Sequence, residues 1–390
     1  MKSILFVSEY YHPFKGGVPI VVKYLAEGMA KKGFRVTVAT SIPKNSSLNQ
    51  EEVIEGVFIK RFFIWRNIAK FIRGDIQRFQ SFVLTGNFDF VILECGQSIT
   101  TDALLPIIER INGIKIIHAH GLSGQVAKAF VFKDDFKHTI GNTYNWLRMK
   151  WYYNITFKNA CPFFDASISL TETDTGYSYL SKNIANNYIL GNAADDIFFN
   201  ESLYQSPLNI ERKTYLISIA NYSVIKDQIN LLRQFYLIDR KDVALVMIGS
   251  SENSYYKRVL KENRKLAAQF GARKVYILTR IDRCFFPIIL ENALVYLTTS
   301  TREEFSISII EAMARGVPFI STNVGNARLL PGGITIDRID DFHIVISKLL
   351  NDEDRMDKLG KEAKEYAYNN CRIETVVDKL VNIINTISEQ

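Results

Sequence analysis

Three acidic residues flank the start of one short helical pattern near the three-quarter point of the chain. The segment TTSTREEFSISIIEAMARGVPFISTNVG, residues 298–325, holds Glu303 and Glu304 just before this pattern and Glu311 within it. The backbone N–H groups at a helix start are unpaired and carry about half a positive charge, so they attract phosphate groups. An apolar strand pattern precedes the expected helix 306–315. We therefore expect the helix start at the carboxyl end of a strand, where open α/β sheets bind ligands.

The spacing of Glu303 and Glu311 suits one long ligand better than one scissile bond. Eight residues along a helix span about 12 Å, whereas the paired carboxylates of glycoside hydrolases lie about 5 to 9.5 Å apart. Carboxylates at the two ends of a sugar nucleotide fit this distance. The alternative for Glu303 and Glu304 is a surface role, in which each stabilises the helix dipole by less than about 1 kcal/mol. Glu311 is harder to explain in this way because its neighbours are apolar: Ile309, Ile310, Ala312 and Met313.

The rest of the chain alternates short apolar strand patterns with helix-length segments. Continuous apolar strands between helices are typical of parallel sheets that are covered on both faces. We expect strands at 4–9, 36–40, 90–94, 115–118 and 166–170 and, after a break near 192–200, at 215–220, 244–249, 274–278, 294–298, 318–321 and 334–336. Two such series predict an α/β chain with two doubly wound, Rossmann-like domains facing a cleft. The predicted domains are 1–195 and 196–371, and we expect a last helix, within 372–390, to cross back to the first.

Several motifs resemble those of retaining glycosyltransferases of family 4, which have the GT-B fold. Glu303 and Glu311 match the family's two glutamates with seven residues between them, and Phe305 follows the first. The opening FVSEYYHPFKGGVPIVVKYLAEGMAKKGFRVTVAT resembles the family's first strand, double-glycine loop and first helix. KIIHAHG resembles its active-site histidine segment, ILGNAADDIFF its interdomain segment, and SIANYSVIKDQINLL its donor-phosphate strand and loop. These motifs occur in the family's order over essentially the whole chain, which makes the resemblance specific.

The resemblance implies roles for individual residues. His120 and Glu303 would contact the donor sugar, Glu311 the ribose hydroxyls and Lys226 the departing diphosphate, so His120, Glu303 and Lys226 are the expected catalytic residues. The expected donor-binding residues are Gly17, Lys226, Glu303, Phe305, Ser306, Ile307 and Glu311. The alternative for His120 is a structural histidine at a strand end. His118, two positions earlier, is expected to face the other side of the strand and to be structural.

Two positions depart from the family's pattern. The family often has an arginine shortly before the lysine, whereas residues 221–223 are Asn, Tyr and Ser. Lys226 then acts alone, or Arg280 or Arg302 supplies the second charge. Ser306 stands where the family usually has glycine, and its side chain restricts the backbone beside the donor. Neither Asp134-Asp135 nor Asp195-Asp196 forms an Asp-x-Asp triplet in a suitable loop, so we expect no metal and no cofactor besides the substrate nucleotide sugar.

Composition favours a protein of a reducing compartment. Of the 390 residues, 47% are apolar and 23% are charged, a balance typical of globular proteins. The apolar run at 4–7 is far too short for a signal peptide or a membrane span. The cysteines are scattered without paired or metal-like spacing, at Cys95, Cys161, Cys284 and Cys371. We expect buried thiols and a cytoplasmic protein.

Positive charge is concentrated in the first half of the chain. Residues 1–195 hold 22 Lys and Arg against 16 Asp and Glu, whereas residues 196–390 are near neutral. In FIKRFFIWRNIAKFIRGDIQRF, residues 58–79, cations alternate with aromatic side chains, and a second such region is 136–158. Such regions suit an anionic membrane surface that carries a lipid-linked acceptor. The expected contacts are Lys60, Arg61, Arg66, Lys70 and Arg73. The alternatives are a helix with a solvated basic face and a nucleic-acid site, which no nucleic-acid-binding motif supports.

The residues and the resemblance together predict a retaining, metal-independent glycosyltransferase. It would move a hexosyl or N-acetylhexosaminyl unit from a nucleotide sugar, a UDP-sugar rather than GDP-mannose, to a hydroxyl of a lipid-linked glycan. It would act in cell-surface polysaccharide synthesis at the inner face of the membrane. Two other functions stay open. One is a catalytically silent sugar-nucleotide-binding partner of another transferase, which the missing arginine suggests, and the other is a GT-B sugar-nucleotide epimerase.

Overall fold

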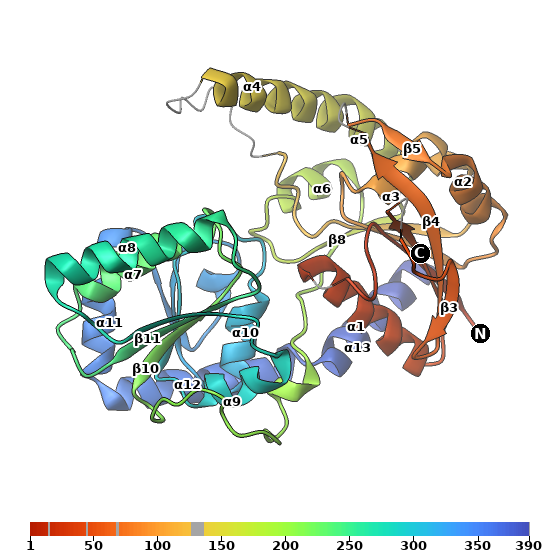
Figure 1. The fold of residues 1–390 in the computed structure, drawn as a ribbon. Coiled ribbons are helices and arrows are strands. Elements are labelled where there is room, and N and C mark those ends of the chain that lie inside the picture. Colours follow the sequence, from red (N-terminus) through yellow and green to blue (C-terminus); the bar gives the residue numbers. More distant parts are fainter. Residues whose placement is uncertain (15, 44–45, 68–69, 126–135, 390) are drawn as a thin grey trace. The chain divides into compact units, whose positions relative to one another are not determined.

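The computed structural model describes residues 1–14, 16–43, 46–67, 70–125 and 136–389. The chain divides into two compact units, Met1–Asn192 with Val376–Gln390, and Ala193–Thr375. Each unit is built around one sheet with helices packed against it (Figure 1). The predicted α/β class with two Rossmann-like sheets is confirmed.

In the described part of the first unit, nine strands form one sheet in the order β3-β4-β2-β1-β6-β7-β8-β9, with β5 beside β4. They are β1 Ser3–Ser8, β2 Arg35–Ile42, β3 Glu51–Ile54, β4 Val57–Arg66, β5 Ile72–Gly74, β6 Phe90–Glu94, β7 Ile114–His118, β8 Ala166–Ser169 and β9 Asn187–Ile189. In this sheet order, every neighbouring pair from β4-β2 to β8-β9 is parallel. β3 and β5 both pair antiparallel with β4. β1 is buried along its whole length, as expected for a strand with helices on both faces.

The helices of the first unit include the C-terminal helix of the chain. They are α1 Gly17–Lys31, α2 Ile76–Thr85, α3 Ile99–Leu104, α4 Phe136–Trp151, α5 Phe157–Ala160 and α6 Tyr177–Asn183, with shorter turns η1 Leu105–Arg110, η2 Tyr152–Thr156 and η3 Cys161–Phe163. α13, Ile373–Ser388, begins in the second unit and packs on the first. Val377 of α13 contacts Gly28 of α1 so closely that no side chain fits at Gly28. Lys32 and Asp378 form an ion pair at 2.5 Å beside this contact.

The second unit has the strand order of a Rossmann-type nucleotide-binding sheet. Its described strands run in parallel in the order β12-β11-β10-β13-β14-β15. They are β10 Tyr215–Ile219, β11 Ala244–Gly249, β12 Val275–Thr279, β13 Val295–Thr298, β14 Phe319–Thr322 and β15 Gly333–Ile336. The order reverses between β10 and β13. Such a reversal leaves a crevice at the carboxyl ends of the two strands, which is where ligands bind in this class of sheet.

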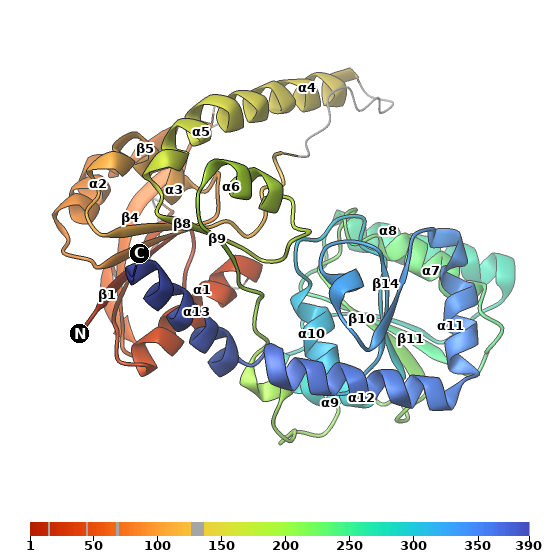
Figure 2. The ribbon, with the colours of Figure 1, turned by 180° about the vertical axis from the view of Figure 1, so that it is seen from behind.

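Helices cover both faces of this second sheet. They are α7 Gln228–Tyr236, α8 Ser254–Phe270, α9 Phe286–Glu291, α10 Ile307–Ala314, α11 Phe342–Leu350 and α12 Glu353–Asn370, with the short turns η4 Asp196–Phe198, η5 Arg283–Phe285, η6 Ala327–Leu329 and η7 Ile339–Asp341. Alternate residues of β10 enter two separate apolar clusters. Tyr215 and Ile217 pack with α9 and α10, and Leu216 packs with α7, α8 and α11. Figure 2 shows these helices on opposite sides of the strands.

Among the described residues, no helix combines the length and the apolar character that crossing a bilayer requires.

Candidate active site

Two loops at the carboxyl edge of the second sheet hold the acidic motif in place. They follow β10 and β13, which are neighbours in the sheet. The backbone N–H of Thr301 donates to the carbonyl of Ile225 at 2.7 Å, and Thr299 Oγ1 donates to the carbonyls of Lys226 and Asp227 at 3.2 and 3.0 Å. These bonds bring Lys226 beside Glu303, with which its ammonium group forms an ion pair.

Glu303 is held from three sides. Besides Lys226, Ser300 Oγ donates to the same carboxylate oxygen at 3.2 Å. Gly325, after β14, has a positive φ of 58°, and a Cβ there would lie 3.0 Å from the Cβ of Glu303. The side chains of Glu303 and Lys226 keep 16% and 26% of their surfaces exposed. Both groups therefore remain reachable by a ligand.

The start of α10 is open for an anion. Ser306 is the N-cap, and its N–H donates to Asn326 Oδ1 at 2.9 Å. The side chain of Ser306 accepts no hydrogen bond from the N–H groups of the first turn. The φ and ψ angles of Ser306, −85° and 102°, are ordinary extended values, so the serine fits here without the freedom of glycine. Phe305 and Ile307 pack, half-buried, against the apolar core below.

Glu311 is buried and paired with a residue that the sequence analysis did not identify. Its side chain is 3% exposed and forms an ion pair with Arg283, which belongs to the η5 turn after β12. Burial raises the pKa of Glu311, and the charge and hydrogen bond of Arg283 act against this rise. The only sequence signal for Arg283 was its place beyond the carboxyl end of a strand. Arg280 and Arg302 are exposed and form no ion pair with any described residue, so a role for either stays a prediction.

In the first unit, two histidines share one carboxylate oxygen. Glu94 ends β6 and lies opposite His118, which ends β7. His118 Nδ1 lies 3.0 Å and His120 Nε2 lies 2.6 Å from Glu94 Oε2, and the two rings are 3.9 Å apart between centroids. The expectation that His118 points away from His120 is therefore wrong. Residues two positions apart in a strand lie on the same face, so the alternation of β7 gave no reason to separate the two rings. The strand ends at His118, and His120, with a positive φ of 52°, brings its ring to the same carboxylate.

This arrangement sets the charge of His120 at neutral pH. Burial alone would raise the pKa of Glu94, but His118 and His120 outweigh it and lower that pKa to about 2. Burial and the neighbouring His118 lower the pKa of His120, against the attraction of Glu94. Glu94 is thus an anion and His120 is neutral at pH 7. A neutral ring that donates Nε2–H to Glu94 keeps Nδ1 as an acceptor.

Within the described residues, this cluster is the one group of three or more potential ligands that could hold a metal ion. The ligand atoms of Glu94, His118 and His120 lie within 4.8 Å of one another. Glu94 Oε1 and His118 Nε2 are buried without a hydrogen-bond partner in the described part of the chain. The contacts of both rings to a single oxygen have hydrogen-bond lengths, so shared protons account for the geometry. Asp195 caps η4, and Asp134-Asp135 lies outside the described residues.

A cavity of about 270 Å³ lies beside Glu94. It is bounded by the end of β1, the end of β6 and the first turns of α1, including Glu9, Tyr10 and Pro19. Gly17 begins α1, and a Cβ placed there would meet nothing within 4 Å. A ligand can therefore approach the backbone of Gly17. Nothing in the first unit itself demands a glycine at this position.

The first basic segment does not form the free cationic surface that its sequence suggested. The described residues of 58–79 form β4, β5 and the start of α2 rather than one helix. Arg61 is 2% exposed, donates to the carbonyls of Asn49 and His12, and pairs with Glu52 at 2.5 Å. Lys60 pairs with Glu51 at 2.7 Å, and Arg66 pairs with Asp102 at 2.5 Å.

The burial of Arg61 contradicts its assignment as a membrane contact. Lys60 and Arg66 have acidic partners but each keep 21% of their side-chain surface exposed, so their assignment stays a prediction. Lys70 and Arg73 are exposed, and Arg73 stacks over Phe71 at 5.9 Å. The expectation for Lys70 and Arg73 stays a prediction.

The second basic and aromatic region presents an apolar stripe to solvent. The exposed fractions of its four large side chains lie between 46% and 61%, at Tyr144, Leu147, Trp151 and Ile155. Spacings of three and four residues place them on one face of α4 and its continuation η2. The opposite face packs into the core through Met149, Tyr152 and Tyr153. Arg148, Lys150 and Lys158 flank the stripe, which we call the α4 stripe.

Known proteins share the fold and part of the sequence. Residues 200–366 match the family model described as glycosyl transferases group 1. The chain is 26% identical over 180 residues to N-acetyl-alpha-D-glucosaminyl L-malate synthase of Bacillus anthracis, covering 44% of this chain and 45% of that protein. It is 21% identical to an uncharacterized glycosyltransferase of Methanocaldococcus jannaschii, covering 100% of this chain and 99% of that protein.

Solved structures resemble the whole chain at low identity. Sucrose-phosphate synthase of Thermosynechococcus elongatus superposes with a TM-score of 0.75 at 16% identity, over 100% of both chains. Anabaena HepE in complex with UDP and glucose superposes with a TM-score of 0.70 at 14% identity, over 99% of this chain and 100% of the other. Identities this low carry information about the fold alone. Residues 200–366 therefore match the glycosyl transferases group 1 model, and the chain as a whole has the GT-B fold.

Proposed function

We propose that this chain is a retaining glycosyltransferase that moves a hexosyl or N-acetylhexosaminyl unit from a UDP-sugar to a hydroxyl group of a lipid-linked glycan. The observation that carries the proposal is the ion pair of Lys226 and Glu303 at the open start of α10, where the strand order reverses. Anabaena HepE, which shares the fold, was solved in complex with UDP and with UDP-glucose, which favours a UDP-sugar over GDP-mannose.

Each part of such a donor has a chemically suited partner in the second unit. The free N–H groups of α10 and the ammonium group of Lys226 suit the diphosphate. An ammonium group has three protons, so Lys226 can hold Glu303 and a phosphate oxygen together. Glu303 accepts from hydroxyls of the sugar. Glu311 accepts from the ribose hydroxyls, and the charge of Arg283 opposes the rise in its pKa that burial causes.

The proposed chemistry needs no covalent intermediate. The leaving diphosphate gains negative charge as the glycosidic bond breaks, and Lys226 with the helix start stabilises that charge. A leaving phosphate oxygen takes the proton of the acceptor hydroxyl, which attacks from the same face and retains the configuration. These groups can perform the step without a metal. His120, neutral and oriented by Glu94, would accept a hydrogen bond from the reacting sugar through Nδ1.

The α4 stripe supports a membrane-borne acceptor. Exposed apolar side chains beside Arg148, Lys150 and Lys158 suit insertion into an anionic bilayer surface, where each cation contributes about 1 kcal/mol. We therefore place the membrane contact on α4 and η2 instead of β4. The enzyme would act as a peripheral protein at the inner face of the membrane, in cell-surface polysaccharide synthesis.

The test is a donor screen with purified protein. UDP-glucose, UDP-galactose, UDP-N-acetylglucosamine and GDP-mannose are compared for thermal stabilisation and for slow donor hydrolysis, with and without a chelator. A donor at 100 times its dissociation constant should add about 2.7 kcal/mol to the free energy of unfolding. Stabilisation with hydrolysis by a UDP-sugar supports the proposal. Binding without any hydrolysis or transfer indicates the silent partner, and conversion of the donor to an epimer indicates the epimerase.

A further inference from the structure

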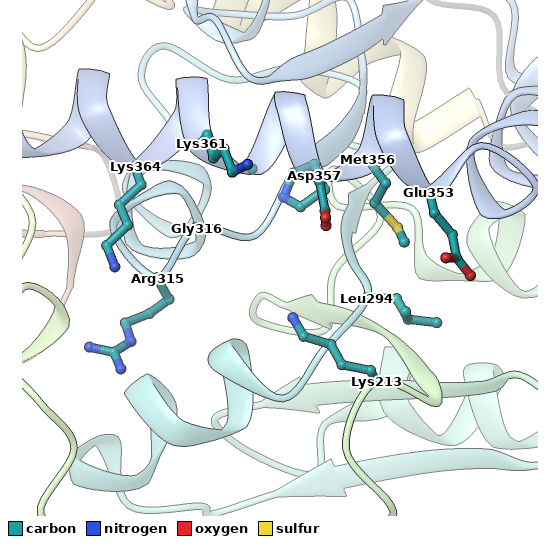
Figure 3. A pocket seen from close by; sticks show the side chains of 11 residues that line it. Lys213, Leu294, Arg315, Gly316, Glu353, Met356, Asp357, Lys361 and Lys364 are labelled. Carbon is teal, nitrogen blue, oxygen red and sulfur yellow. The ribbon is translucent and has the colours of Figure 1, made fainter.

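A separate cavity lies at the amino ends of the strands of the second sheet, whereas Lys226 and Glu303 lie at the carboxyl ends. Its volume is about 570 Å³, within the range of about 300 to 1,000 Å³ of small-molecule sites. One wall is a single face of α12, and the other is formed by residues that precede β10, β13 and β14 and by the end of α10 (Figure 3). The cavity belongs wholly to the second unit.

Two glycines allow the walls to meet at one end of the cavity. Gly316 ends α10 with a φ of 70°, and Gly360 of α12 crosses it. A Cβ on Gly360 would lie 2.6 Å from the Gly316 carbonyl oxygen. The two walls therefore meet where Gly316 and Gly360 cross.

The charges that line the cavity are separated by sign along α12. Lys361 and Lys364 lie near the glycine crossing, together with Arg315, whereas Glu353 and Asp357 lie toward the start of the helix (Figure 3). Within the described residues, neither lysine forms an ion pair with any acid. Arg315 is anchored by Glu291 and by the carbonyl of Asn200.

The opposite wall adds one more cation and an apolar floor. Lys213 points toward α12 (Figure 3) and donates one of its three protons to the carbonyl of Ala293 at 2.7 Å. Two ammonium protons of Lys213 are thus left for a ligand. Leu294 and Met356 line the acidic end and offer apolar contact to a ligand's C–H groups.

We propose that this cavity is a second small-molecule site, which binds a sugar phosphate. The phosphate group would lie among Lys213, Lys361 and Lys364, where charge-assisted hydrogen bonds hold it. The sugar hydroxyls would donate to Asp357 and Glu353. A monosaccharide phosphate matches both the volume and the separation of charges. The proposal concerns binding alone and does not depend on transferase activity.

The position of the cavity predicts communication with the donor site. α10 is capped by Ser306 at its start and by Arg315 at its end, with Gly316 next, so this one helix borders both sites. A ligand that displaces the end of α10 acts on a rigid element whose start receives the diphosphate. Any such coupling is reciprocal, so donor and sugar phosphate must change each other's affinity by the same factor.

Calorimetric titration with glucose 6-phosphate, inorganic phosphate and glucose tests the site. Wild-type protein should bind glucose 6-phosphate saturably, phosphate more weakly and glucose not measurably. The double variant K361E/K364E should lose at least about tenfold in affinity for both anions, which is about 1.4 kcal/mol. E353Q/D357N should weaken glucose 6-phosphate binding and leave phosphate binding unchanged. Circular dichroism confirms that each variant is folded.

Two control variants separate this site from a general charge effect and from the donor site. Lys358 is exposed on α12 but does not line the cavity, so K358E should bind glucose 6-phosphate like the wild type. K226A should also retain binding, since Lys226 lies at the other edge of the sheet. The proposal would be overturned if K358E lost as much affinity for glucose 6-phosphate as K361E/K364E, or if K226A lost affinity. It would also be overturned if the wild type showed no saturable binding up to about 10 mM.

Discussion

Lys226 and Glu303 form an ion pair between the loops that follow two neighbouring strands, β10 and β13, although 77 positions separate them in the chain. The pair lies at the point where the strand order reverses. It joins a cation suited to a diphosphate with a carboxylate suited to sugar hydroxyls.

Replacing Lys226 with alanine should lower kcat by about 10² to 10³-fold, the usual cost of removing one electrostatic stabiliser of a developing charge. The effect on donor affinity should be smaller, because the helix start still binds the diphosphate. Steady-state kinetics with the donor found in the screen measures both. R280A and R302A are matched controls. Near-normal turnover in K226A together with a large loss in either control would move the role to that arginine.

Removing the Glu311 carboxylate should weaken donor binding with little effect on kcat. Hydrogen bonds to a charged group contribute about 1.5 to 3 kcal/mol, so E311A should raise the dissociation constant of the donor by about 10 to 150-fold. Calorimetry with the intact nucleotide sugar and with a nucleotide lacking the ribose hydroxyls measures the loss. The variant and the wild type should bind the deoxy nucleotide equally well. Unchanged affinity for the intact donor would remove Glu311 from the ribose site.

The histidine cluster predicts opposite pH shifts for two variants. The pKa of His120 lies below its ordinary value of 6.5, so kcat should be constant near pH 7 and fall only on the acid side of 6.5. Glu94 raises and His118 lowers the pKa of His120. E94Q should therefore move the acid limb to lower pH and H118N should move it to higher pH. Identical limbs in all three proteins would show that His120 does not govern the profile.

The same groups link folding to pH. The lowered pKa of His120 means that the unfolded chain takes up its proton first as the pH falls below 6.5, which destabilises the fold. The pKa of Glu94, lowered from 4.5 to about 2, adds stability above pH 4.5 that is lost as the pH falls toward 2. Hydrogen exchange of the β6 and β7 amides should accelerate as pH falls, after correction for the intrinsic rate. E94Q should abolish the acceleration of exchange that occurs below pH 4.5.

The α4 stripe should be required for binding to anionic vesicles. Sedimentation with vesicles that contain about 30% anionic lipid should recover wild-type protein, and binding should decrease with salt. L147S/W151S should lose at least about 1.5 kcal/mol of binding free energy, the burial energy of one large apolar side chain. Leu203, 92% exposed in the second unit, gives the control L203S, which should bind like the wild type. Failure of wild-type protein to bind any vesicle would favour an acceptor free in solution.

Local features of the sequence determined the elements and the donor motif. The apolar runs at β1, β6 and β11 mark buried parallel strands because a strand covered on both faces admits few polar residues. Around Glu311, the apolar neighbours and the glycine after Arg315 predict a buried helix that ends just before Gly316. These features depend on residues within one turn or one strand of each other, so the sequence carries them directly.

Tertiary structure alone decided which charged groups meet. Arg283 pairs with Glu311, and His118 shares Glu94 with His120, because the order of strands in each sheet brings distant loops together. Arg61 looks like a surface cation in its basic segment, yet β3 and β4 pair and leave it buried against Glu52. Charge and periodicity specify what a residue can do. The partner that satisfies it is set by strand order, which no local pattern encodes.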